Sequence, residues 1–232
     1  MSSTVQAIID GGFAKSAAAR PDSFQSPAEL VAEVGSALRA CFQVLARENP
    51  YILGTSAVVA FGGTGWARPS GCLRVIKVLS DAGTVATPAL AVGAEIAVVP
   101  YDDQAVCAGR ASVTELGQVF QPTGQVNDPS AGTLTIVYAR APQLPVIATE
   151  TVDALFPGEF DDYLKFDMAA YLAMKDKRLE DEQTFRASQS ALLQQIIDWS
   201  QEQTYSLVQR FPLVTPPSTN TNAGRQQPAK GA

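Results

Sequence analysis

The densest run of side chains that could do chemistry lies at residues 160–182. The run reads FDDYLKFDMAAYLAMKDKRLEDE, with several carboxylates among aromatic rings. Carboxylates can hold a divalent cation or act as a general acid and base, but only when they converge on one point. On a helix, Asp161 and Asp162 lie in the first turn, where acids complement the helix dipole, and Asp167 does not share a face with them. The spacing therefore favours a solvated acidic helix face over an active site.

The same helix carries charges that are spaced for pairing. Asp161 and Lys165 stand four residues apart with the acid first, the order that best supports an ion pair on a helix. We expect the aromatic side chains to pack within the protein and the charges to meet a neighbouring subunit. The candidate subunit-interface residues are Asp161, Asp162, Lys165 and Tyr171.

Other possible catalytic patterns are weak. The chain has no histidine, which excludes the Ser-His-Asp and Cys-His nucleophile systems and the common zinc sites. FGGTGW at 61–66 lacks the third glycine and the following helix of a dinucleotide-binding loop, and favours a loop that packs against a partner. VPYDDQ at 99–104 is typical of a polar turn after a strand. We predict no enzymatic activity, no catalytic residues, no cofactor and no metal site.

Composition limits which partners the protein is expected to bind and in which cellular compartment it is expected to be made. The net charge of −6 argues against tight binding to a nucleic-acid backbone, yet it suits a protein that lines a DNA path. Cys41, Cys72 and Cys107 form no CxxC pair and are expected to be small buried side chains in a reducing compartment. No signal sequence or membrane span is expected, so the protein should be made in the cytoplasm.

Helical spacing is clearest at residues 26–47. Ser26 is placed as the N-cap and Pro27 as the first helical residue, and Glu29, at the third helical position, completes a capping box with Ser26. Apolar residues then recur at helical spacing, and Asn49-Pro50 ends the run. These apolar residues are Leu30, Val34, Leu38, Cys41, Phe42 and Leu45. Residues 7–22 are expected to hold a short helix that is broken at Gly11-Gly12.

Residues 51–149 have the texture of a β-domain. Five segments, at 56–61, 72–79, 95–101, 110–116 and 133–140, are rich in β-branched residues and separated by turn signals. In the last segment, Leu134, Ile136 and Tyr138 are expected to face one side. We predict a small antiparallel sandwich or barrel, with an exposed loop at 124–132.

The pattern returns to helix from residue 153. Apolar stripes occur on both sides of the charged KDKRLEDE at 175–182, which is either a turn between two helices or the wet middle of one long helix; we favour a hairpin. The final stretch, PLVTPPSTNTNAGRQQPAKGA, is too poor in apolar residues to form a core. We expect it to be an arm that is ordered by a neighbouring subunit.

Together these patterns predict an α+β fold. N- and C-terminal helices form a helical bundle, an antiparallel β-domain is inserted between them, and an extended C-terminal arm follows. The predicted parts are the N-terminal helical part at 1–50, the inserted β-domain at 51–149, the helical hairpin at 150–211 and the arm at 212–232.

This order of elements resembles the head-to-tail adaptor (connector) proteins of tailed bacteriophages. Three segments carry the resemblance: SPAELVAEVGSALRACFQVL at 26–45, LFPGEFDDYLKFDMAAYLAMKD at 155–176 and FRASQSALLQQIIDW at 185–199. The proline-led entry into an alanine- and aromatic-rich helix is the most suggestive feature. In that family the terminal helices form a bundle and β-structure is inserted between them.

The resemblance implies a structural protein of the virion neck. About twelve copies would form a ring between the portal and the tail or neck proteins, and would extend the channel through which double-stranded DNA passes without sequence-specific binding. The family's C-terminal segments contact the portal, which makes residues 211–232 the candidate portal-binding or neighbour-binding arm. Its named candidates are Phe211, Pro212, Leu213, Val214, Pro216, Pro217, Arg225 and Lys230.

Three other classes of function stay open. One is another tail structural protein, such as a tail-completion or tail-tube protein, which would be mostly β. Another is a cytoplasmic enzyme that uses a carboxylate-bound divalent ion. The third is a host regulatory or scaffolding protein that assembles through its helices.

Overall fold

The computed structural model describes residues 3–17, 26–81, 91–100, 111–124 and 132–210, with side chains as far as residue 203. Within these residues the α-helices are α1 (Val5–Ser16), α2 (Pro27–Glu48), α3 (Asp161–Lys175) and α4 (Leu179–Arg210). Short 3₁₀ helices are η1 (Pro50–Leu53) and η3 (Gly158–Phe160). The strands are β1 (Gly54–Ala60), β2 (Trp66–Ala67), β3 (Cys72–Ser80), β4 (Glu95–Val99), β5 (Ala111–Leu116), β6 (Val119–Gly124) and β7 (Thr133–Arg140).

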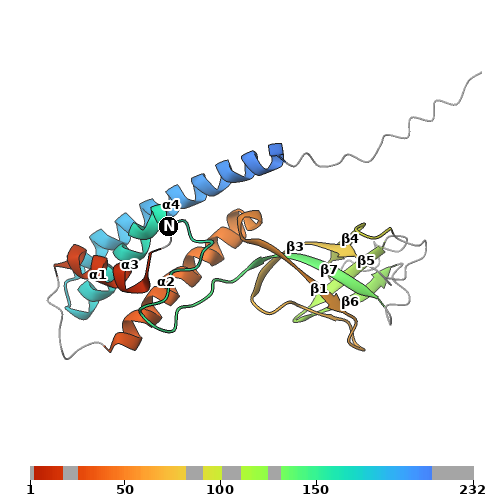
Figure 1. Cartoon of the computed structure of the whole chain (residues 1–232), viewed down its shortest axis with the longest axis horizontal. Helices are drawn as coiled ribbons and strands as arrows, with labels where there is room; N and C mark the ends of the chain where they lie inside the picture. Colours follow the sequence, from red (N-terminus) through yellow and green to blue (C-terminus); the bar gives the residue numbers. More distant parts are fainter. Residues whose placement is uncertain (1–2, 18–25, 82–90, 101–110, 125–131, 211–232) are drawn as a thin grey trace, which may run out of the picture.

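The molecule is elongated, with the helices at one end and the sheet at the other (Figure 1). Each end has its own hydrophobic core. The helical core gathers residues from all four helices, such as Ile8, Leu38, Leu164 and Ile196. The sheet encloses a second core that is built around Trp66, Phe120 and Ile136. Burial of these two sets of apolar side chains is the main stabilising contribution at each end.

The sheet corrects the predicted fold class. Its seven strands run in the order β1-β7-β3-β4-β5-β6-β2, and a bridge between Phe61 and Trp66 joins the two edges into a nearly closed barrel. Strands β4 and β5 are parallel, so the sheet is mixed and not antiparallel. The prediction of a helical bundle that carries a small inserted antiparallel β-domain is therefore wrong, because this sheet is a principal part of the fold. The predicted arm lies outside the described residues.

Two strands were not predicted from the sequence. Strand β2 is only two residues long, and β6 contains Pro122, which cannot donate a backbone hydrogen bond to a ladder. Pro122 is tolerated because it lies past the end of β2, where one edge of β6 has no partner strand. Gly117, at φ 62°, makes the tight turn that joins β5 to β6.

Strand β7 links the two cores. Leu134 and Ile136 are buried inside the barrel-like sheet and Tyr138 packs against them, which confirms the predicted face of this strand. Ala139 belongs to the helical core instead. One strand therefore lines the barrel with its first part and meets the helices with its last part.

Helix α2 begins and ends as predicted. The Ser26 hydroxyl accepts from the backbone N–H of Glu29 at 3.2 Å, and the six predicted apolar positions are all buried. The predicted capping box is present, because the Glu29 carboxylate also accepts a hydrogen bond from the Ser26 backbone N–H. The same carboxylate binds Tyr171 and Lys175 of helix α3, so a tertiary contact is added to the expected local one.

Helix α1 is continuous through Gly11-Gly12, so the predicted break is wrong. The two glycines instead allow α3 to approach closely. A Cβ on Gly12 would lie 2.3 Å from Cγ of Met168, and one on Gly11 would lie 2.6 Å from Cδ of Lys165. Close packing of α1 on α3 offsets the conformational cost of glycine in a helix.

Helices α3 and α4 form the expected hairpin. Asp176, Lys177 and Arg178 make the turn, with Lys177 in the left-handed region at φ 60°. The alternative of one continuous helix is wrong. Phe160, just before α3, stacks edge-on against Trp199 with ring centroids 5.8 Å apart, so α3 accompanies α4 as far as Trp199.

A buried ion pair ties the end of the sheet to the helices. Arg140, the last residue of β7, donates two hydrogen bonds of 2.8 Å to the two carboxylate oxygens of Asp153. The backbone N–H groups of Gln143 and Leu155 donate to the same carboxylate. Burial would raise the pKa of Asp153, but the hydrogen bonds from Arg140 and the backbone outweigh it and lower that pKa.

Gly12→Ala should destabilise the protein by about 1–3 kcal/mol, because the added methyl group overlaps Met168 near its backbone. The matched control is Gly35→Ala in α2, where a Cβ would meet Pro145 at an ordinary 3.7 Å. The control should be neutral or stabilising by up to about 1 kcal/mol, since alanine is the better helix former. Urea denaturation measures both, and equal effects would contradict the close approach of α1 and α3.

Asp153→Asn should destabilise the protein by about 3 kcal/mol at neutral pH, because it leaves Arg140 without its counter-ion. The stability from this carboxylate is present above its unfolded-state pKa and is lost as the pH falls through the lowered folded-state pKa. The difference between the variant and the wild type should therefore shrink in strong acid. Denaturation as a function of pH tests this, with Glu150→Gln, an exposed carboxylate of the same segment, as control.

Candidate functional site

Asp162 lies at the contact between α1 and α3. Lys165 and Lys15 reach its carboxylate at 3.0 Å and 3.3 Å. The hydrogen bond from Lys165 is the main reason that the pKa of Asp162 is lowered, with a smaller contribution from Lys15. The expected pair of Lys165 with Asp161 is thus replaced by one with Asp162, and a lysine from α1 completes the cluster.

Asp161 is buried, with 8% of its surface exposed, so a solvated face is the wrong interpretation for this residue. Its Oδ2 accepts a hydrogen bond from the Ser3 hydroxyl, and its Oδ1 has no hydrogen-bond partner among the described residues. The carboxylate therefore fastens the chain before α1 to the start of α3.

Tyr171 lies between α2 and α3. Its hydroxyl donates to the Glu29 carboxylate, which Lys175 also reaches at 2.9 Å. Burial, and then the hydrogen bond to Glu29, raise the pKa of Tyr171. Hydrogen bonds from Tyr171 and Lys175 lower the pKa of Glu29. The four predicted subunit-interface residues thus make contacts within the chain, and a role between subunits stays a prediction.

Three helices meet at a second carboxylate, Asp167. Only 5% of its surface is exposed, so the solvated-face interpretation is wrong here as well. Its Oδ1 accepts from Arg186 at 2.6 Å and from Gln189 at 2.8 Å, both on α4. Glu33 of α2 hydrogen-bonds the same carboxylate, and burial followed by the nearby charge of Asp167 raises the pKa of Glu33. The cluster joins α2, α3 and α4 at one buried polar point.

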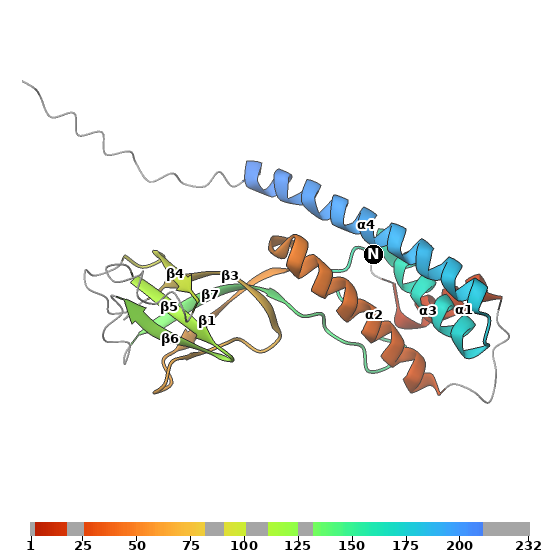
Figure 2. The ribbon, with the colours of Figure 1, turned by 180° about the vertical axis from the view of Figure 1, so that it is seen from behind.

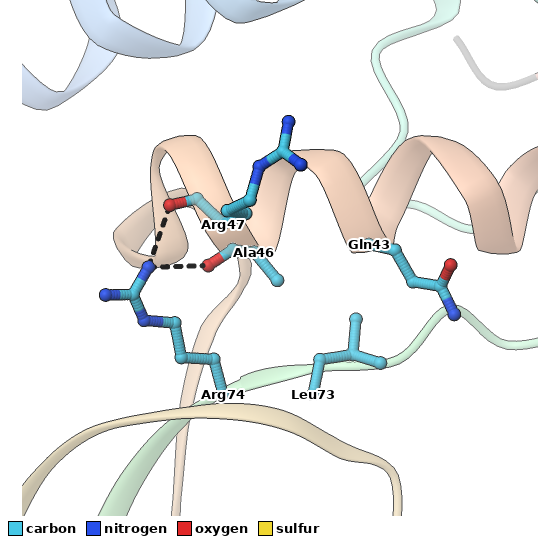
Figure 3. A pocket seen from close by; sticks show the side chains of 5 residues that line it. All are labelled: Gln43, Ala46, Arg47, Leu73 and Arg74. Atoms are coloured by element: carbon cyan, nitrogen blue, oxygen red, sulfur yellow. Dashed lines mark hydrogen bonds between the residues drawn. The ribbon is translucent and has the colours of Figure 1, made fainter.

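A pocket of about 440 Å³ opens where α2 meets the sheet. Gln43, Ala46 and Arg47 line it from α2, and Leu73 and Arg74 line it from β3 (Figure 3). The Arg74 guanidinium donates to the backbone carbonyl of Arg47 at 2.8 Å and also reaches that of Ala46 at 3.5 Å. Arg74 thereby caps the C-terminal end of α2 and stabilises it, as expected for a cation at that end of a helix.

The described ranges contain no group of three or more carboxylate or cysteine side chains placed to hold a metal ion. Cys41 is buried and burial raises its pKa to about 12, which makes it an inert core thiol; Cys72 is half-buried. The loop at 61–66 closes the edge of the sheet, and Cys107 and most of VPYDDQ lie outside the described residues. None of the described helices is long and apolar enough to cross a membrane.

Exposed surfaces that are open to partners include the outer sides of the helices and one linker. On α2 the exposed side carries Arg39 and Arg47, and on α4 it carries Asp198 and Glu202. Between β7 and α3, Val146 and Ile147 are 77% and 55% exposed. Contiguous exposed apolar side chains of this kind are typical of protein contact sites.

Sequence patterns that are typical of catalytic or metal sites do not identify these outer faces. The signal was nevertheless present, since the exposed positions of α2 and α4 follow from the same helical period as the buried ones. Neither a known protein family nor a curated protein matches the chain.

Glu33→Gln should raise the thermal stability near neutral pH, since an uncharged amide avoids placing a second charge beside Asp167. A raised carboxyl pKa means that wild-type stability is highest while Glu33 is protonated and falls as the pH rises through the folded-state pKa. The variant should therefore gain most at high pH and little in acid. Thermal melts across pH measure this, and Glu48→Gln, at the exposed end of α2, is the control.

Proposed function

We propose that this protein is a head-to-tail adaptor of a tailed bacteriophage, a structural protein of the virion neck. About twelve copies form a ring between the portal and the tail and extend the DNA channel. The observation that best supports the proposal is the length of helix α4, which continues well past its last residue in the helical core, Ile196.

Helix α4 spans 32 residues, or about 48 Å, whereas α3 spans 15 residues, or about 22 Å. Trp199 of α4 contacts Phe160, and the Ser200 carbonyl accepts a hydrogen bond of 2.6 Å from the Asn49 side chain. The helix then continues to Arg210, beyond the helical core (Figure 1). A short helical extension is marginal in water by itself, so α4 is suited to packing against another subunit.

The shape and charge of the molecule also suit a ring that surrounds DNA. Helices and sheet lie at opposite ends, so the two ends of such a ring would offer different surfaces to the portal and the tail (Figure 2). The net charge of −6 opposes adhesion to the phosphate backbone. DNA would pass through without sequence-specific binding.

The portal-binding arm stays a prediction. Residues 211–232 lie outside the described part of the chain, directly after α4. The proposal assigns the first contact with the portal to this arm, which would extend the reach of α4.

A tail-completion or tail-tube protein is the second candidate. The nearly closed seven-stranded sheet favours it, because the sheet is larger than the sequence suggested. The helices α2 and α4 favour the adaptor, since tail-tube proteins are mostly β.

Co-sedimentation of the purified protein with the portal protein of the same genome, imaged by electron microscopy, tests the proposal. We expect a ring that caps the portal, and loss of this cap when residues 212–232 are deleted. A matched control replaces those residues with a Gly-Ser linker of equal length, which keeps the chain length and removes the side chains. Rings that stack on tail tubes and ignore the portal would favour the second candidate, and a protein that stays monomeric with both partners would contradict both.

A further inference from the structure

The exposed faces of α2 and α4 carry opposite charges. The outer face of α2 consists of small and polar residues with two cations, Arg39 and Arg47, whose charged groups point to solvent. Arg47 pairs at 2.8 Å only with its exposed neighbour Glu48, and its own side chain is 74% exposed. Among the described residues of the chain, no acidic helix face packs against this basic face of α2.

The outer face of α4 is acidic. Glu180, Asp198 and Glu202 lie on the side that faces away from α3, and all three are exposed. The only cation among the described side chains of α4, Arg186, points inward and is bound to Asp167. Charge on this face is therefore of one sign.

The two faces point away from each other within one molecule. Asn49, the residue after α2, donates to the Ser200 carbonyl of α4, so the end of α2 meets α4, and the exposed positions of each helix lie on its other side. Both helices run from the end of the molecule that holds α1 toward the sheet (Figures 1 and 2). A heterologous contact that closes a ring requires two different, complementary faces of this kind.

The residues on the two faces also match in spacing. With the helices aligned in parallel, Ala32 and Ser36 of α2 fall beside Ala187 and Ala191 of α4, where small side chains permit a close approach. In the same register Arg47 falls beside Glu202, and Arg39 falls beside Gln194, one helical turn before Asp198. Successive copies in a ring of about twelve are rotated by only about 30°, so a nearly parallel alignment of α2 and α4 is kept between neighbours.

We propose that the outer face of α2 is the docking site for the outer face of α4 from a second copy of this chain. The interface is parallel, with small residues in contact at one end, Arg47 against Glu202 at the other, and Arg39 within one helical turn of Asp198. This inference rests on the proposed ring, and it names the faces through which neighbouring copies associate. The charges set register and partner choice more than affinity, because they lie at an exposed rim.

Charge reversal on one face at a time tests the proposal. The full-length double variant Arg39→Glu/Arg47→Glu has two acidic faces, and Asp198→Lys/Glu202→Lys has two basic faces. Each variant alone should self-associate at least about tenfold more weakly than the wild type, because like charges then face each other. An equimolar mixture of the two should associate again, since each acidic face can then meet a basic one. Sedimentation velocity at low and high salt measures all four samples, and high salt should reduce the differences.

Control reversals of exposed charges lie elsewhere on the molecule, at Lys177→Glu in the α3–α4 turn and Glu95→Lys in β4. These should leave self-association within about twofold of the wild type. Restored association in the mixture also shows that both reversed chains are folded.

The outcomes separate the inference from the proposed function. Reversed variants that form wild-type oligomers, or a mixture that fails to associate, would overturn the inference, while portal binding could still support the adaptor. Self-association that follows the charge pattern without any portal binding would support the inference and contradict the adaptor. A wild-type protein that stays monomeric with and without portal would overturn both.

Discussion

The fork between Arg140 and Asp153 fixes the linker that leads from the sheet to helix α3. Strand β7 lines the barrel-like sheet as far as Tyr138 and then reaches the helical core, and Arg140 is its last residue. Because Asp153 also accepts two backbone N–H groups, the carboxylate orders the turn that leads into α3. A buried carboxylate is costly unless it is fully paired, so this geometry holds the linker in one conformation.

Polar side chains likewise hold the helices in one arrangement. Asp161, Asp162, Asp167 and Tyr171 each join α3 to another segment, and every one of these contacts lies within the chain. These carboxylates therefore favour one arrangement of the packed helices over others. The exposed surfaces open to partners include the outer side of α2, the outer side of α4 and the linker at Val146 and Ile147.

This division suits a subunit of a larger assembly. A rigid interior keeps the two outer helix faces at constant positions, and an assembly with closed symmetry needs such constancy, since an angular error repeats with every copy. Helix α4 continues past Ser200 as far as Arg210. Opposite charges on the two faces would favour the correct neighbour over random contacts.

The sequence by itself determined the local elements. Helical period, the Ser26 cap and the charged turn at 175–182 predicted α2, α3 and α4, and alternation in β7 predicted which side faces the barrel, because these signals act over a few residues. Only the tertiary structure decided which strands pair, that β4 and β5 are parallel and that the sheet nearly closes, since pairing joins residues far apart in the chain. It also decided that Asp161 and Asp167 are buried and that the capping residue Glu29 binds Tyr171 and Lys175 as well. Each of those outcomes depends on a partner from another element, such as Ser3, Arg186 or Tyr171, which no local pattern can identify.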